Sequence, residues 1–173
     1  MGEALNDAKL EADGYNALGG VYWRRGNLQI VWEHWLKALR LRESIDDKAG
    51  MAASYSNLGM LLDSEGDYPG ALEYYQRAWE IDRQIGSAPL EIAATINNIG
   101  SVHEQFDDSE AALHYHREAL AIRESAGDKR ATATSQNNMG AALVDLERWD
   151  EGRVALLEAQ GIREEIGDLS GLA

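Results

Sequence analysis

The sequence predicts an all-α fold made of four helix–turn–helix repeats. Three regularities carry this prediction. An apolar residue followed by glycine recurs every 40 or 41 residues, an alanine follows each glycine by 19 residues, and a residue suited to ending a helix follows each alanine by eight. The three columns are Leu18-Gly19, Leu58-Gly59, Ile99-Gly100 and Met139-Gly140; Ala38, Ala78, Ala119 and Ala159; and Asp46, Gly86, Gly127 and Gly167.

The first helix of each repeat carries a stripe of mostly apolar residues at helical spacing. The stripes are Tyr15, Leu18, Gly19, Tyr22; Tyr55, Leu58, Gly59, Leu62; Ile96, Ile99, Gly100, His103; and Gln136, Met139, Gly140, Leu143. A glycine inside a helix costs about 1 kcal/mol relative to alanine. Four such glycines in register therefore predict that the partner helix approaches each bare Cα closely.

The second helix of each repeat carries a stripe that includes small residues. The stripes are Val31, Trp35, Ala38, Leu41; Ala71, Tyr75, Ala78, Ile81; Ala112, His116, Ala119, Ile122; and Gly152, Leu156, Ala159, Ile162. The small residues permit the same close approach from the other side. The other large aromatic residues on or beside these stripes, such as Trp32 and Trp79, are interpreted as packing residues.

One column predicts where the second helices begin. It holds Asn27, Asp67 and Asp108, whose side chains can accept a hydrogen bond from free backbone N–H groups at a helix start. Pro69 follows Asp67 closely, where a missing N–H does no harm. Arg148 takes this column in the fourth repeat, so its cap is predicted to be weaker or shifted to Asp150.

The columns divide the chain into repeats at residues 12–51, 52–92, 93–132 and 133–172. One extra residue falls between Gly86 and Gly100, and Pro89 marks this altered loop. Residues 1–11 are predicted to be the tail of a preceding repeat or an N-terminal extension of the first helix. Ala173 stands where a fifth repeat would begin. Since each repeat of a solenoid buries its face on a neighbour, we expect self-association through uncapped ends.

Composition excludes several classes of protein. The chain of 173 residues has a net charge of −14, no cysteine and 45% hydrophobic residues. The acidic balance argues against binding a nucleic-acid backbone, and the absence of cysteine excludes disulfides and sulfur-ligated zinc. No apolar run reaches the ~18 residues of a membrane span, and no signal peptide is visible. We therefore expect a cytoplasmic protein that binds neither membrane nor nucleic acid.

Catalytic signatures are absent from the sequence, so a non-enzymatic protein without cofactor or metal is predicted. Gly19-Gly20 lacks the preceding strand and the following Gly-Lys-Ser/Thr of a phosphate loop. His103 and His116 fall in facing core columns of the third repeat, where a hydrogen-bonded core pair is favoured over a metal pair. His114 lies two residues from His116, so the two point to different faces of a helix.

The pattern resembles the tetratricopeptide repeat family. The matching residues are the Leu-Gly pairs or their equivalents, the alanine column, Tyr22, Ala71 and Ala112, and the aromatics Trp35 and Tyr75. The period is longer than the usual 34 or so residues and is similar to that of kinesin light chains, Leu-Gly-Asn repeat scaffolds and bacterial peptide-sensing regulators. The resemblance implies a right-handed superhelical solenoid whose first helices line a concave, peptide-binding face.

Asparagines recur on the first helices beside the apolar stripe. They are Asn16, Asn57, Asn97, Asn98, Asn137 and Asn138. Asparagine forms helices poorly, and the family resemblance implies that asparagines here hold the backbone of an extended peptide. A carboxamide offers both a donor and an acceptor, which match a peptide N–H and C=O. The alternative is that these asparagines bond between adjacent repeats, and one side chain could serve both roles.

The columns one helical turn after the glycines add charge to the predicted binding face. They hold Trp23, Asp63, Glu104 and Val144, and then Arg24, Ser64, Gln105 and Asp145, while Asp13 lies near the entrance of the first repeat. The surface is mildly acidic, with Trp23 and Arg24 in the first repeat. We expect a partner segment that carries Lys or Arg, with an apolar anchor against Trp23. Phosphopeptides and C-terminal carboxylates are disfavoured because no basic cluster lies here.

The sequence thus favours a non-catalytic scaffold that binds an extended, basic peptide or partner segment. Two alternatives stay open. One is a sensory or regulatory segment of a larger signalling protein, and the other is a structural piece that self-assembles through its ends.

Overall fold

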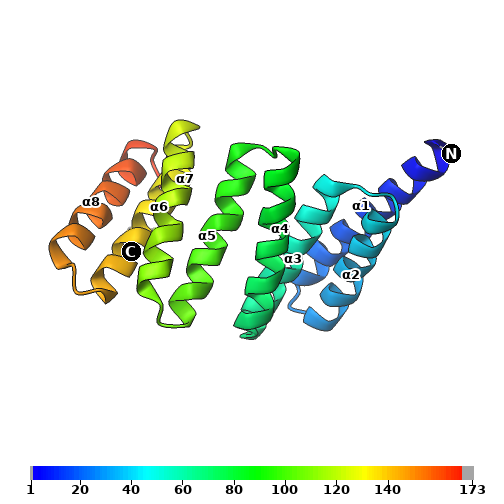
Figure 1. Ribbon diagram of the computed structural model, residues 1–173, viewed down its shortest axis with the longest axis horizontal. Coiled ribbons are helices and arrows are strands. Elements are labelled where there is room, and N and C mark those ends of the chain that lie inside the picture. The colour runs from blue at the N-terminus through cyan, green and yellow to red at the C-terminus, as the bar shows by residue number, and fades with distance from the viewer. Residues whose placement is uncertain (1, 169–173) are drawn as a thin grey trace. The chain divides into compact units, whose positions relative to one another are not determined.

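The computed structural model describes residues 2–168, with side chains from Leu5 onward, and these residues form eight α-helices (Figure 1). The helices are α1 Gly2–Trp23, α2 Leu28–Ser44, α3 Lys48–Glu65, α4 Tyr68–Ile85, α5 Pro89–Gln105, α6 Ser109–Ser125, α7 Lys129–Asp145 and α8 Trp149–Glu165. The predicted all-α fold of four helix–turn–helix repeats is therefore confirmed. The predicted start of a fifth repeat at Ala173 lies outside the described residues.

The chain divides into two compact units after Ser87, which we treat separately. Unit 1 holds α1–α4 and unit 2 holds α5–α8. Within unit 1, α1 packs on α2 and α3 on α4, and α2 joins the two pairs by contacting α3. Within unit 2, α5 packs on α6 and α7 on α8, and α6 contacts α7. None of the described helices combines the length and apolarity needed to cross a bilayer.

Helix α1 is longer than the other helices. It has 22 residues, against 17 or 18 in α2–α8, and residues 2–11 lie in it without a break. Helix α4 has one residue more than α2 or α6, and Pro89 is the first residue of α5.

The turns after the second helices are left-handed where the sequence predicts that these helices end. Asp46, Gly86, Gly127 and Gly167 have φ values of 54°, 65°, 71° and 68°. Glycine adopts this region without the Cβ clash that other residues meet, and Asp tolerates it better than most. The predicted helix-ending column is confirmed in all four repeats.

The predicted helix caps are confirmed in part. Asp67 Oδ1 accepts a hydrogen bond from Gly70 N (3.1 Å), and Asp108 Oδ1 accepts one from Ala111 N (3.2 Å). Asn27 precedes α2 but makes no capping bond with its side chain. Of the two alternatives predicted for the last cap, a weaker cap is confirmed, since Arg148 makes no capping bond with its side chain, and a shift to Asp150 is not. Helix α8 begins at Trp149 directly after Arg148, whose side chain instead binds Glu151.

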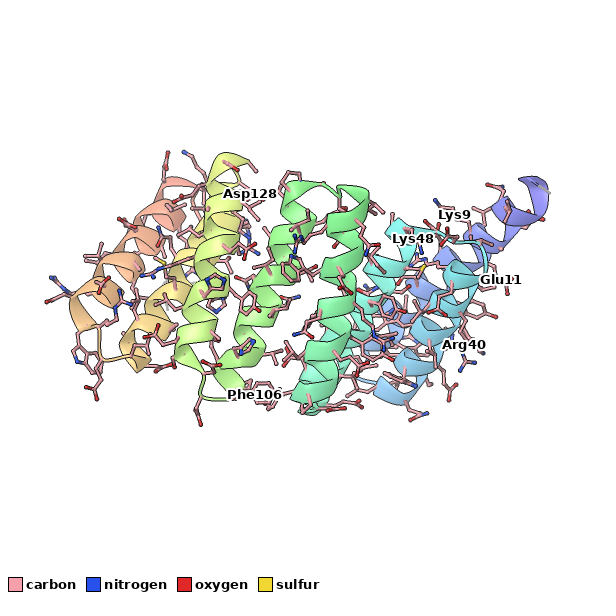
Figure 2. All side chains as sticks on the ribbon, viewed as in Figure 1. Lys9, Glu11, Arg40, Lys48, Phe106 and Asp128 are labelled. Atoms are coloured by element: carbon pink, nitrogen blue, oxygen red, sulfur yellow. The ribbon has the colours of Figure 1, made fainter. Side chains whose placement is uncertain are left out.

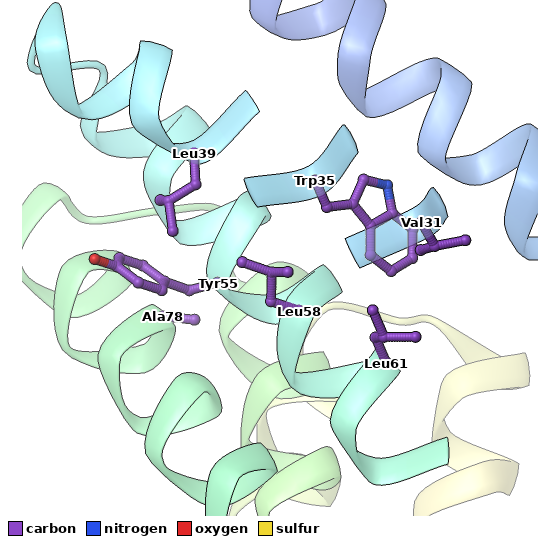
Figure 3. Packing of buried hydrophobic residues seen from close by; sticks show 7 residues of the cluster. All are labelled: Val31, Trp35, Leu39, Tyr55, Leu58, Leu61 and Ala78. Carbon is purple, nitrogen blue, oxygen red and sulfur yellow. The ribbon is translucent and has the colours of Figure 1, made fainter. Parts of the chain in front are cut away.

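Each unit has its own apolar core. In unit 1 the core joins both helix pairs and is rich in rings and large aliphatic groups: Val31, Trp35, Leu39, Tyr55, Leu58, Leu61 and Ala78 (Figure 3). In unit 2 a smaller cluster joins α6, α7 and α8: Ala112, Leu113, Ala142, Leu143 and Ala155. The second core thus contains smaller side chains at the junction of its helices.

The four helix pairs share one close contact, between the glycine of the first helix and a large side chain of the second. A methyl group added at Gly59 would lie 2.8 Å from Tyr75 Cδ1, and one added at Gly100 would lie 2.7 Å from His116 Cε1. Gly140 meets Leu156 Cγ at the same 2.7 Å, and Gly19 meets the Trp35 indole. The close approach predicted from the glycine column is confirmed.

This contact predicts that Gly59→Ala destabilises the protein. The added methyl would force the buried Tyr75 ring to shift, and overpacking of this kind costs about 1–3 kcal/mol. Gly20→Ala is the matched control, because nothing lies within 4 Å of the added atom in α1. There we expect a gain of up to about 1 kcal/mol from helix propensity. Urea unfolding measures the stability of both variants, and equal changes in the free energy of unfolding would contradict the packing argument.

Candidate functional site

The candidate asparagines of unit 1 bond to each other across two first helices. Asn57 Nδ2 on α3 donates to Asn16 Oδ1 on α1 over 2.8 Å. The backbone carbonyl of Asn16 also accepts a hydrogen bond from Trp35 Nε1 (3.2 Å). Both carboxamides are half-buried. The bond between adjacent repeats, weighed from the sequence as an alternative to peptide binding, is therefore present in unit 1.

Unit 2 repeats this arrangement and adds a buried cation. Asn138 Nδ2 on α7 donates to Asn97 Oδ1 on α5 over 3.3 Å. Arg123 Nη1 on α6 donates to the same oxygen (3.2 Å) and to Ser135 Oγ (2.6 Å). Asn97 and Arg123 are only 8% and 7% exposed, and burial lowers the pKa of the Arg123 guanidinium below its ordinary value. One asparagine thus holds three helices together.

The other two asparagines of unit 2 have unused hydrogen-bonding groups. Asn98 on α5 and Asn137 on α7 are half-buried, and neither side chain makes a hydrogen bond within residues 2–168. Each lies beside a bonded neighbour, since Asn98 follows Asn97 and Asn137 precedes Asn138. The bond between Asn97 and Asn138 therefore joins the two helices, while Asn98 and Asn137 each keep a donor and an acceptor that no described residue uses.

Sequence reasoning missed a buried arginine that joins the helix pairs of unit 1. Arg42 Nη1 on α2 donates to Ser54 Oγ (2.8 Å) and to Gly50 O (3.1 Å), both on α3. Its Nη2 forms an ion pair of 2.8 Å with Asp13 on α1. Asp13, expected at the entrance of the binding face, is thus engaged within the fold.

The signal for these arginines was present as two further columns. Arg42 and Arg123 stand 81 residues apart, as do Ser54 and Ser135, and each arginine precedes its serine by 12. The equivalent position on α4 is Asp82, which is also buried and accepts a hydrogen bond from Ser87 Oγ (2.6 Å). A column that changes sign in one repeat is easily dismissed as surface charge, which is why sequence reasoning passed over it.

Three predicted binding residues lie against the large side chain that covers the glycine of their own repeat. Trp23 stacks on Trp35 with ring centroids 5.8 Å apart. Glu104 Oε1 accepts a hydrogen bond from Nε2 of His116, which is fully buried (3.2 Å, 0% exposed). The residue one turn after each glycine is thus placed to complete the packing of its helix pair.

The third of these residues, Asp63, is a half-buried carboxylate. Burial raises the pKa of Asp63 above its ordinary value. Burial also raises the pKa of the Tyr75 hydroxyl, and the charge of Asp63 raises it further. No cation pairs with Asp63 among residues 2–168. Asp63 is therefore a half-buried anion that lacks a counter-charge within the described protein.

The remaining predicted binding residues are exposed. Arg24 follows the end of α1 and Asp145 ends α7. Charged side chains project into solvent elsewhere on the helices as well, as Figure 2 shows for Lys9, Glu11, Arg40 and Lys48. Most of the charge therefore coats outward faces.

The histidines form no metal centre in the described part of the chain. His103 Nδ1 lies 3.5 Å from Asp108 Oδ2 and its ring stacks on Tyr115 at 5.3 Å. The predicted hydrogen-bonded core pair of His103 and His116 is not formed within residues 2–168, because each histidine faces a carboxylate instead and His103 is only half-buried. No group of three or more His, Asp or Glu side chains that could hold a metal ion occurs within residues 2–168.

Comparison with known proteins places this arrangement among helical repeats. A family model described as "Tetratricopeptide repeat" matches residues 10–84 and 91–165. No curated protein matches the sequence. The fold is similar to the crystal structure of BtubC (BKLC) from P. vanneervenii, with 23% identity and a TM-score of 0.84 over 92% of this chain and 66% of that one.

Two further solved structures share the fold. One is the apo form of RapI, with 15% identity and a TM-score of 0.87 over 92% of this chain and 58% of that one. The other is aspartyl phosphate phosphatase F from Bacillus subtilis, with 14% identity and a TM-score of 0.85 over 91% of this chain and 41% of that one. The chain spans less than two thirds of the length of all three.

The hydrogen bonds of unit 2 predict different effects on stability for two asparagines at equivalent positions, Asn97 on α5 and Asn137 on α7. Asn97→Ala removes the acceptor of two bonds and leaves the buried Arg123 short of one partner, which costs about 1–3 kcal/mol. Asn137→Ala removes no side-chain bond and favours the helix, so stability should change by about 0.5 kcal/mol or less. Thermal unfolding with both variants compares them, and equal losses would show that Asn137 also supports the fold.

The raised pKa of Asp63 predicts that Asp63→Asn stabilises the protein at neutral pH. A carboxyl whose pKa is higher in the folded state favours folding below its unfolded pKa, about 3.8, and this contribution is lost as pH rises through the folded pKa. The gain should therefore appear near pH 7 and vanish at pH values below about 3.8. Melting curves across this range test it, with Glu65→Gln, at the exposed end of α3, as control. A gain that did not depend on pH would contradict the assignment.

Proposed function

Because the chain belongs to the tetratricopeptide repeat family, whose repeats form protein-interaction domains, we propose that it is a non-catalytic scaffold that binds an extended, basic segment of a partner protein. The segment lies along the first helices of a unit, over α1 and α3 in unit 1 or over α5 and α7 in unit 2. The contact residues proposed in unit 1 are Asn16, Asn57, Trp23, Arg24 and Asp63. Those in unit 2 are Asn97, Asn98, Glu104, Asn137, Asn138 and Asp145.

The observation that carries this proposal is the pairing of used and unused carboxamides on α5 and α7. The bond between Asn138 and Asn97 sets the spacing of the two helices, so Asn98 and Asn137 are held in place before any ligand arrives. Their free donor and acceptor groups match those of an extended backbone, which repeats one N–H and one C=O per residue. Recognition of this kind reads the backbone and leaves the choice of side chains to neighbouring residues.

The charge of the partner follows from the carboxylates on the same helices. Asp63 is half-buried with a raised pKa and lacks a counter-charge within the described residues, so a Lys or Arg brought by a partner would relieve its desolvation. Asp145 adds an exposed negative charge on α7. These groups favour a basic segment over an acidic one.

A second candidate function is a regulatory segment of a larger signalling protein. Its support is the similarity in fold to longer chains, one of which is titled aspartyl phosphate phosphatase F. In that case partner binding would be relayed to an effector domain. The gene that encodes this chain distinguishes the two candidates, because effector sequence joined to these repeats would favour the second.

The proposal predicts that Lys- and Arg-rich peptides bind and that Glu-rich ones do not. Two pools of fluorescein-labelled twelve-residue peptides, one of each kind, serve as probes in fluorescence anisotropy. The double variant Asn98→Ala, Asn137→Ala should weaken binding of the basic pool about tenfold or more without lowering the melting temperature. Raising the salt from about 50 mM to about 500 mM should also weaken it, since exposed charges are screened.

The control for this experiment is Gln160→Ala, which removes an exposed carboxamide from α8 and should leave affinity unchanged. Unaltered binding in the double variant with intact helicity would contradict a role for the asparagines. Equal binding of the acidic pool would contradict the role of charge.

A further inference from the structure

Unit 2 contains a hollow on the side formed by its second helices. It is an open depression of about 410 Å³ between α6, α7 and α8, within the range of pockets that hold small molecules or anchoring side chains. Its apolar lining is Met139 and Leu143 from α7 and Val154 and Ala155 from α8. The asparagines of the proposed peptide-binding face do not line it.

The equivalent position in unit 1 is filled by aromatic rings. The two family matches are displaced by 81 residues, so Ala155 corresponds to Tyr74. The Tyr74 ring lies 5.8 Å from that of Tyr55 and 6.3 Å from that of Trp32, and it packs on the core of unit 1. Unit 2 has Gln136 in place of Tyr55 and Leu113 in place of Trp32. Three rings in one unit are thus replaced by three smaller side chains in the other, and one of these, Ala155, lines the hollow.

Behind the wall of the hollow, one buried polar side chain is incompletely satisfied in its hydrogen bonds. Gln136 Nε2 donates to Glu158 Oε2 over 2.9 Å, and Glu158 lines the hollow. Gln136 is 6% exposed, and its Oε1 is buried without a hydrogen-bond partner in the described part of the protein. In unit 1 the same pair of positions is Tyr55 and Arg77, whose guanidinium lies 5.8 Å from the Tyr55 ring centroid. In unit 1 this pair of positions therefore forms a contact between a cation and a ring, whereas in unit 2 it forms a hydrogen bond between two polar side chains.

The rim of the hollow is acidic. Its lining carries the carboxylates of Asp150, Glu151 and Glu158 and the cation of Arg117, and Arg148, outside the lining, pairs with Glu151. Arg148 donates two hydrogen bonds to Glu151 (2.8 and 2.7 Å), which lower the pKa of that carboxyl. An apolar floor with a negative rim complements a ligand that combines an aromatic ring with a neighbouring positive charge.

We propose that this hollow is a second binding site, which takes an aromatic side chain of a partner protein that stands next to Lys or Arg. The ring occupies the volume that Tyr74 fills in unit 1, resting on Met139, Leu143 and Ala155. The adjacent cation meets Asp150, Glu151 and Glu158 at the rim. This site does not depend on the proposed peptide-binding face, because the two sites use different residues of unit 2.

The test uses three peptides of one length: acetyl-Lys-Tyr-Lys-amide, acetyl-Lys-Ala-Lys-amide and acetyl-Glu-Tyr-Glu-amide. Titration of the full chain is followed by NMR through the methyl groups of Met139, Val154 and Ala155. The first peptide should shift these signals, and the other two should bind at least about tenfold more weakly. Equal affinity for the alanine peptide would overturn the role of the ring, and equal affinity for the glutamate peptide would overturn that of the rim.

Three variants distinguish binding in the hollow from binding on the proposed peptide-binding face and from self-association. Ala155→Tyr supplies the ring that unit 1 has, so it should abolish binding of acetyl-Lys-Tyr-Lys-amide without lowering the melting temperature. Glu158→Arg, at an exposed position, should weaken binding about tenfold even where Ala155→Tyr fails to fold. Asn98→Ala with Asn137→Ala should leave it unchanged. Binding of acetyl-Lys-Tyr-Lys-amide that survives Glu158→Arg overturns the proposal. The proposal is also overturned if the unmodified chain self-associates and Glu158→Arg removes that association, because the hollow would then hold a second copy of the chain.

Discussion

The contact between a glycine of the first helix and a large side chain of the second is the constraint on which each repeat depends. With no Cβ in the way, the rings of Trp35, Tyr75 and His116 lie directly on the backbone of the partner helix. In these three repeats the covering side chain is then buried, and it reaches toward the residue one turn beyond the glycine. In two repeats that residue matches the side chain that it meets: a stacked indole for Trp35, and a hydrogen-bonding carboxylate, Glu104, for His116.

The junction between successive helix pairs depends on polar contacts as well as on apolar ones. In both units a buried arginine near the end of one second helix bonds to a serine on the next first helix, Arg42 to Ser54 and Arg123 to Ser135. Hydrogen bonds to charged groups contribute about 1.5–3 kcal/mol each and require a fixed geometry. This arginine–serine contact, which we call the arginine clamp, fixes the register of neighbouring repeats more narrowly than aliphatic packing does, because aliphatic packing tolerates small displacements.

The repeat itself could be predicted from the sequence because its signals are local and occur four times. Glycine, alanine and helix-ending columns reappear as close contacts, buried stripes and left-handed turns. The site was predicted less completely. Trp23 and Glu104 each stand two turns after an asparagine on the same helix, and this spacing predicted that they bind the same ligand. The spacing does not show that a side chain of the second helix, Trp35 or His116, reaches them first. The arginine clamp joins residues from three helices, so no single helical stripe contains it.

The hydrogen bonds between asparagines give the first-helix face a polarity. In both units the later helix supplies the donor and the earlier one the acceptor: Asn57 to Asn16 and Asn138 to Asn97. Each pair therefore leaves an amide N–H₂ toward the beginning of the sequence and a carbonyl oxygen toward its end, while the bonded oxygen of Asn97 is shared with Arg123. A polypeptide is itself directional, with its N–H and C=O groups in a fixed order. For the partner segment that we propose, this order of donor and acceptor groups would favour one strand direction along the row over the other.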